Sequence, residues 1–171
     1  MNRAREVLVC INRTSGGMAR GKSEAEEIRS VLEREGLTAR VELLTGNGIA
    51  ERAKAAAEKG AGLFVVGGGD GSVSAAAGVL AGTKTRLGIL PLGTLNHFAR
   101  DLGIPLKLAE AAALIGEGKA RRIDVAEVNG RIFVNNSAIG LYPLMVIDRD
   151  QQRKKLGRNK RLAMLVASAR T

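Results

Sequence analysis

A run of glycines and one carboxylate follows directly after a short apolar stretch, and this arrangement constrains the fold more than any other feature. Residues 63–66 are Leu-Phe-Val-Val, and residues 67–72 are Gly-Gly-Gly-Asp-Gly-Ser. The apolar stretch is typical of a buried parallel strand. Residues 72–81 are expected to form a helix with Ser72 as its N-cap. A strand, a glycine turn and a helix start gather backbone N–H groups and a positive dipole end in one crevice, which suits a phosphate.

The rest of the first two thirds alternates between expected strands and expected helices. The strands are expected at residues 6–12, 38–45, 62–66 and 86–90, and the helices at residues 22–35, 49–59, 72–81 and 106–115. This alternation predicts an α/β fold, a Rossmann-like parallel sheet with helices on both faces. Ligands bind beyond the carboxyl ends of the strands in such sheets. The loops after Asn12, Val66 and Leu90 are therefore expected to share one edge.

The pattern changes near residue 121. Residues 123–128 and 131–135 are expected to form two strands joined by Asn129-Gly130, a dipeptide that favours a type I′ hairpin turn. We therefore predict a nucleotide-binding α/β domain at residues 1–121, followed by the start of an antiparallel β domain at 122–171. A hairpin and a tail bury too little apolar surface to fold alone, so we expect the chain to end inside its second domain. A short native protein whose hairpin docks on the first domain is the alternative.

The charge of the chain indicates an anionic partner. The formal net charge is +10, which suits a nucleotide, a nucleic acid or an acidic membrane. Aromatic residues make up 2% of the sequence, which argues against a nucleic-acid binder built on base stacking. The basic residues of 153–161, ahead of an apolar helical face at 162–169, could hold the chain on an anionic membrane, and a solvated charged face is the alternative.

The cysteine and hydropathy patterns bear on the compartment. Cys10 is the single cysteine, so the chain has no disulfide framework and a reducing compartment is expected. No segment has the roughly 20 apolar residues that span a bilayer. We expect a cytoplasmic protein, with peripheral association at the inner membrane face.

Two further loops carry groups suited to phosphate. Residues 16–23 match the P-loop pattern G-x-x-x-x-G-K-S, although four residues separate this motif from the preceding strand. A P-loop NTPase that uses Lys22 is thus an alternative to a phosphate-touching loop of another kind. In the turn after residues 86–90, Thr94 and Asn96 offer short donors and acceptors for a phosphate or a base edge, and a helix cap explains them equally well. His97, the single histidine, is a poor candidate for a metal ligand.

Taken together, these motifs resemble the diacylglycerol kinase catalytic-domain family, which also includes sphingosine kinases, ceramide kinases and bacterial lipid kinases. Three signatures occur in family order, at residues 12–17, 68–72 and 91–100. Residues 123–143 are similar to the opening of the family's second domain. The glycine signature alone is shared with phosphofructokinases and NAD kinases, whereas Pro-Leu-Gly-Thr-Leu-Asn-His-Phe-Ala-Arg at 91–100 is far more specific.

The resemblance implies ATP bound between an α/β domain and a β-sandwich. Together with Asn96, the candidate nucleotide contacts are Asn12, Thr45, Gly68, Gly69, Asp70, Gly71, Ser72, Val73, Ser74 and Thr94. Asp70 would lie near the transferred phosphate as the candidate catalytic residue; the matching acid is the general base in sphingosine kinases. Bacterial lipid kinases use an Asp far into the second domain, where acidic residues also hold Mg²⁺, so no metal ligand is predicted here. Two residues depart from the family pattern: Arg13 replaces a proline, and His97 an aspartate.

The predicted function is that of an ATP-dependent lipid kinase, which transfers the γ-phosphate of ATP to the hydroxyl of a diacylglycerol-like or sphingoid lipid. The cofactors are ATP and Mg²⁺, and the chain alone is expected to have little activity. The alternatives are the P-loop NTPase and a basic, non-enzymatic nucleic-acid binder. A homodimer is left open.

Overall fold

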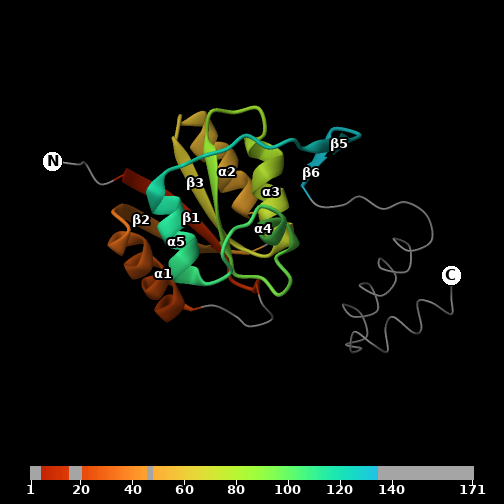
Figure 1. The fold of residues 1–171 in the computed structure, drawn as a ribbon. Coiled ribbons are helices and arrows are strands. Elements are labelled where there is room, and N and C mark those ends of the chain that lie inside the picture. Colours follow the sequence, from red (N-terminus) through yellow and green to blue (C-terminus); the bar gives the residue numbers. More distant parts are fainter. Residues whose placement is uncertain (1–4, 16–20, 46–47, 135–171) are drawn as a thin grey trace, which may run out of the picture. The chain divides into compact units, whose positions relative to one another are not determined.

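The computed structural model describes residues 5–15, 21–45 and 48–134 (Figure 1). The elements, in chain order, are β1 (Arg5–Asn12), α1 (Lys22–Arg34), β2 (Leu37–Leu44), α2 (Gly48–Glu58), β3 (Leu63–Gly68), α3 (Asp70–Leu80), β4 (Arg86–Pro91), α4 (His97–Asp101), α5 (Leu108–Glu117), β5 (Ala126–Val128) and β6 (Arg131–Phe133). The predicted order of strands and helices is confirmed, apart from α4, which the sequence analysis did not predict.

Four parallel strands form the central sheet, in the order β2-β1-β3-β4. From β1 the chain moves outward to β2, then crosses back so that β3 lies on the other side of β1. The direction of winding therefore reverses between β1 and β3. A reversal of this kind opens a crevice at the carboxyl ends of the two strands, which here end at Asn12 and Gly68.

Alternate residues of each strand enter two separate apolar cores, one on each face of the sheet. Val7, Val9 and Ile11 of β1 pack with α1 and α5, whereas Cys10 packs with α2, α3 and α4. β3 divides in the same way: Val65 lies in the first core, and its neighbours lie in the second. Figure 1 shows α1 and α5 on one side of the sheet and α2 and α3 on the other, which confirms the predicted α/β architecture.

Helix α3 begins earlier than the sequence analysis predicted. Its N-cap is Gly69, whose backbone is extended, and whose carbonyl accepts hydrogen bonds from Ser72 N at 2.9 Å and Val73 N at 3.1 Å. The prediction of Ser72 as N-cap was therefore wrong. β3 continues to Gly68 and the helix begins at Asp70, so Ser72 is buried in the first helical turn. One consequence is that Asp70 is itself the first residue of the helix.

Strands β5 and β6 form the predicted antiparallel hairpin. Asn129 and Gly130 have φ angles of +50° and +74°, as a type I′ turn requires. The predicted domain boundary at 121/122 stays a prediction. The described hairpin belongs to the same compact unit as the sheet. The reason is packing: the carbonyl oxygen of Ile132 lies 3.8 Å from the Cβ position of Gly78 on α3, and Val134 packs against the second core. The predictions for residues 153–161 and 162–169 lie outside the described residues.

Candidate functional site

The carboxyl ends of β1, β3 and β4 and the start of α2 surround a cavity of about 330 Å³. Its lining residues are Asn12, Thr14, Ser15, Ile49, Gly69, Asp70, Gly71, Ser72, Ala75, Gly93 and Thr94. Most of them are glycines or short polar residues. Within this described lining, no lysine or arginine occurs, and Asp70 is the single acid. An anion bound here would therefore be held by backbone N–H groups, hydroxyls and the positive end of the α3 dipole.

The two loops that carry the glycine and Thr94 signatures touch backbone to backbone. A Cβ atom on Gly93 would lie 2.3 Å from Gly69 Cα, and one on Gly69 would lie 3.2 Å from Gly93 Cα. Just before this contact, Leu92 N donates a hydrogen bond to Gly68 O at 3.0 Å. Because a real Cβ essentially never comes closer than 3.0 Å to another heavy atom, the loops need glycine at position 93 to meet in this way.

Short polar side chains tie the loop after β1 to the start of α3. Asn12 Nδ2 donates to Ser72 Oγ at 2.9 Å, while Asn12 Oδ1 accepts from both the backbone N–H and the hydroxyl of Thr14, at 3.0 and 2.9 Å. A Cβ on Gly68 would lie 2.6 Å from Ser72 Oγ and 3.1 Å from Ser15 Oγ, so these hydroxyls crowd against bare backbone. The loops after β1 and β3 therefore form one polar surface.

Asp70 bridges the glycine loop to helix α4. Its Oδ1 accepts a hydrogen bond from Phe98 N at 2.9 Å, and its Oδ2 accepts one from His97 N at 3.1 Å. The preceding residue, Asn96, has a φ angle of +52°, a left-handed conformation that asparagine tolerates. Its amide folds back on the turn, accepting from Gly93 N at 2.9 Å and donating to Pro91 O and Gly93 O at 3.2 and 2.9 Å.

The structure brings together six of the predicted site residues and places the others outside the cavity lining. The residues that line the cavity are Asn12, Gly69, Asp70, Gly71, Ser72 and Thr94. Gly68 is buried at the end of β3, Val73 is buried in the second core, and Asn96 is buried within its own turn. Ser74 lies further along α3, and Thr45 directly follows β2.

Five lining residues were missed, namely Thr14, Ser15, Ile49, Ala75 and Gly93. The sequence carried a signal for only some of them. Thr14 and Ser15 lie in the first family-like signature and Gly93 in the third, so attention to hydroxyls and glycines within those motifs could have found them. Ile49 and Ala75 are ordinary helix residues, and only the packing of α2 and α3 reveals their position.

The P-loop alternative is not favoured. At the start of α1, Gly21 N donates to Glu24 Oε2 at 2.9 Å, so a side chain of the helix itself caps the position where a P-loop helix would meet phosphate. Lys22 is not part of the cavity lining. The preceding residues 16–20 of the motif lie outside the described residues.

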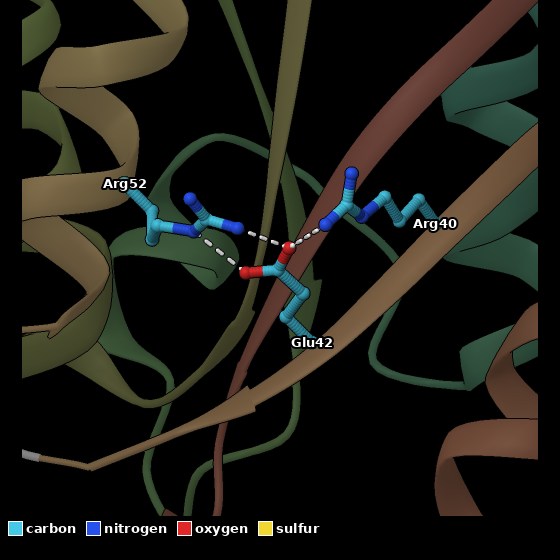
Figure 2. A network of polar contacts seen from close by, with 3 residues as sticks. All are labelled: Arg40, Glu42 and Arg52. Atoms are coloured by element: carbon cyan, nitrogen blue, oxygen red, sulfur yellow. Dashed lines mark hydrogen bonds and ion pairs between the residues drawn. The ribbon is translucent and has the colours of Figure 1, made fainter.

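Figure 2 shows an ion-pair network between β2 and α2. Arg52 Nε donates to Glu42 Oε2 at 2.6 Å, Arg52 Nη2 contacts Oε1, and Arg40 Nη2 lies 3.1 Å from the same oxygen. The hydrogen bond from Arg52 is the main cause that lowers the pKa of Glu42. The Glu42–Arg52 pair joins β2 to α2, the two elements on either side of Thr45. Helix α2 carries the cavity residue Ile49.

Cys10 lies next to this network, fully buried. Burial, with a smaller contribution from the carboxylate of Glu42, raises the pKa of its thiol to about 12. The thiol therefore stays protonated near neutral pH and acts as a small core residue rather than as a nucleophile.

No metal centre is preformed in the part of the chain that the structure describes: no three His, Cys, Asp or Glu side chains gather closely enough to hold an ion.

None of the helices within the described ranges combines the length and hydropathy that crossing a bilayer requires.

Comparison with known proteins identifies the family. Residues 6–128 match the model of the diacylglycerol kinase catalytic domain. The chain belongs to the diacylglycerol kinase catalytic-domain family. This confirms the resemblance seen in the signature motifs, and the match covers β1 to β5, including every residue that lines the cavity.

Relatives in this family include proteins named probable lipid kinase YegS-like. Those of Yersinia pestis (strain Pestoides F) and Yersinia pseudotuberculosis serotype O:1b (strain IP 31758) are each 38% identical to the chain over 129 residues, which cover 72% of this chain and 44% of theirs. A diacylglycerol kinase structure from Bacillus anthracis str. Sterne has a TM-score of 0.66 at 30% identity, covering 79% of this chain and 51% of that one. The chain therefore spans about half the length of the relatives it matches.

We expect Gly93→Ala to destabilise the fold by roughly 1–3 kcal/mol, because the new Cβ would collide with the backbone of Gly69 and force the two loops apart. Urea denaturation measures the change. Gly62→Ala is the matched control, since no atom lies within 4 Å of its Cβ position and its φ angle is not positive. Equal stability of the two variants would contradict the close contact.

We expect the Glu42–Arg52 pair to stabilise the fold at neutral pH and to lose this contribution in acid. Because the folded state holds the pKa of Glu42 below its ordinary value of 4.5, the contribution is complete above that value and disappears as the pH falls through the lower folded-state pKa. Unfolding curves of Glu42→Gln and the unmodified chain should therefore differ at pH 7 and converge at the acid end. Glu33→Gln, at an exposed position on α1, serves as control. A difference that is independent of pH would contradict the assignment.

Proposed function

We propose that this chain forms the nucleotide-binding part of an ATP-dependent lipid kinase, which transfers the γ-phosphate of ATP to the hydroxyl of a diacylglycerol-like or sphingoid lipid. The family supports a kinase acting on lipid. The observation that carries the nucleotide assignment is the backbone contact of Gly69 with Gly93, because it places the start of α3 and Thr94 around one cavity. Phosphoryl transfer asks a protein mainly to position the nucleotide and to neutralise charge, and such a cavity serves the first task.

The polyphosphate of ATP fits the chemistry of the cavity. Gly71 brings the first turn of α3, at the positive end of the helix dipole, to the cavity with no side chain in the way. The hydroxyls of Ser15 and Thr94 border the same space. A Cβ on Gly68 would collide with Ser72, and one on Gly93 with Gly69, so these two glycines let the loops pack closely at the cavity.

The described cavity lining offers one carboxylate as a ligand for Mg²⁺. Asp70 is the single carboxylate of the described lining, and both its oxygens accept backbone N–H bonds. One carboxylate of this kind does not make a metal site, so Mg²⁺ would be held mainly by the phosphates of the nucleotide itself. The ion would neutralise charge on the transferred phosphate.

The lipid-facing chemistry depends on the part of the relatives that this chain does not span. By resemblance, the acceptor channel comes from a second domain, and either Asp70 or an acid of that domain removes the proton of the lipid hydroxyl.

The basic residues of 153–161 support a place at an anionic, inner membrane face, in the cytoplasm. The family assignment and the scarcity of aromatic residues argue against the nucleic-acid binder.

Gly71→Ala tests the phosphate cradle. Apart from its own helix and chain neighbours, no atom of the described residues lies within 4 Å of the added Cβ. The unfolding free energy should therefore stay constant or rise by about 0.5–1 kcal/mol, as for an alanine that replaces a helical glycine. The same Cβ would enter the space proposed for a phosphate, so ATP affinity measured by calorimetry should fall at least about tenfold. Gly62→Ala should change neither quantity. Unchanged ATP binding by a stably folded Gly71→Ala variant would contradict the assignment.

A direct assay separates the lipid kinase from its alternative. The purified 171-residue chain should bind ATP and phosphorylate diacylglycerol in vesicles slowly or not at all, because it spans about half the length of its relatives. Lys22→Ala should leave ATP binding intact. Loss of nucleotide binding in that variant would favour the P-loop NTPase, and rapid phosphorylation of diacylglycerol would contradict the expected low activity.

A further inference from the structure

We propose that Asp70 is a positioning residue: its carboxylate holds the Thr94 turn and the glycine loop in one arrangement, so that both face the same phosphate. This proposal rests on the proposed nucleotide site. The candidate role of Asp70 as general base stays a prediction. The holding role concerns the protein before any phosphate is transferred, and it rests on the hydrogen bonds of the Asp70 carboxylate to backbone N–H groups.

Helix α4 lacks the usual cap at its start. Its N-cap residue, Asn96, makes no side-chain capping bond, because its amide is engaged with the carbonyls of Pro91 and Gly93 and with Gly93 N. The acceptors for the first-turn amides of α4 come instead from Asp70, which precedes His97 by 27 residues in the sequence. Helices usually take a capping oxygen from their own N-cap residue, whereas α4 takes it from a residue of α3.

Accepting both N–H groups at the start of α4 requires a carboxylate rather than an amide. Each oxygen of Asp70 accepts one N–H, from His97 and from Phe98. An asparagine offers a single oxygen, and its NH₂ group would face a backbone donor. Asp70 is also the first residue of α3, where the helix dipole favours a negative charge. One charged side chain therefore stabilises the starts of two helices.

These bonds fix the position of Thr94 from both sides. On one side, Gly93 lies against the backbone of Gly69. On the other side, α4 is held to Asp70. Thr94 lies between these two attachments and lines the cavity. Loss of the carboxylate would leave only the glycine contact, so the Thr94 turn would move more freely and meet a phosphate less often in the right geometry.

The holding role and a purely catalytic role predict different measurements. A residue that serves only as a base changes turnover, and it leaves the binding of ATP without lipid unaffected. A residue that holds two loops together changes nucleotide affinity, and it protects the backbone amides that it accepts.

The test compares Asp70→Asn with Asp101→Asn, an exposed acid on the same short helix. Amide hydrogen exchange at His97 and Phe98 is followed by NMR, and ATP binding by calorimetry. We expect Asp70→Asn to exchange both amides at least about tenfold faster and to bind ATP about tenfold more weakly, as for loss of a hydrogen bond to a charged acceptor. Asp101→Asn should match the unmodified chain in both measurements.

Three results would overturn the proposal. The first is unchanged exchange at both amides in Asp70→Asn, and the second is faster exchange with unchanged ATP affinity. The third result is measured on the unmodified chain, so it also decides the case in which Asp70→Asn does not fold. It is that the amides of His97 and Phe98 exchange as fast as in an unstructured peptide. Failure of the unmodified chain to bind ATP overturns the proposed function, and with it the nucleotide part of the positioning role, whereas the exchange measurement still decides the holding role by itself.

Discussion

The contact between the backbones of Gly69 and Gly93 is the constraint on which the site depends. Two loops that follow neighbouring strands can meet this closely only where neither carries a side chain at the point of contact. Once they meet, the first turn of α3, Thr94 and the polar loop after β1 surround one cavity. The carboxylate of Asp70 then secures the second loop through α4. The order of the sheet matters equally, because the reversal between β1 and β3 is what opens the crevice.

The described lining of the cavity consists mostly of glycines and short polar side chains. Although the net charge is +10, the described lining contains no lysine or arginine. Backbone dipoles and hydroxyls hold a ligand at fixed geometry, whereas charges spread over a surface act at longer range on association. The Glu42–Arg52 pair belongs to neither group, since it joins β2 to α2.

The sequence predicted the parts of the fold that depend on local patterns. Apolar runs and helical spacing gave the order of elements, and the grouping of the loops after Asn12, Val66 and Leu90 followed from strand direction. Features set by contacts between distant residues were missed. Ser72 has the right chemistry for an N-cap, yet the helix starts at Asp70 because the glycine turn is tighter than the pattern suggests. Helix α4 has only five residues, and its cap comes from 27 residues away. The packing of the hairpin against the sheet unit depends on the contact of Ile132 with Gly78 and of Val134 with the second core, which no local pattern shows.

A crystal structure of the chain with an ATP analogue and Mg²⁺ tests the central claim most directly, namely that the two glycine-bearing loops form one phosphate site. The account predicts phosphate oxygens against the first turn of α3, between Gly71 and Thr94. Phosphates bound instead at the start of α1, beside Lys22, would contradict it.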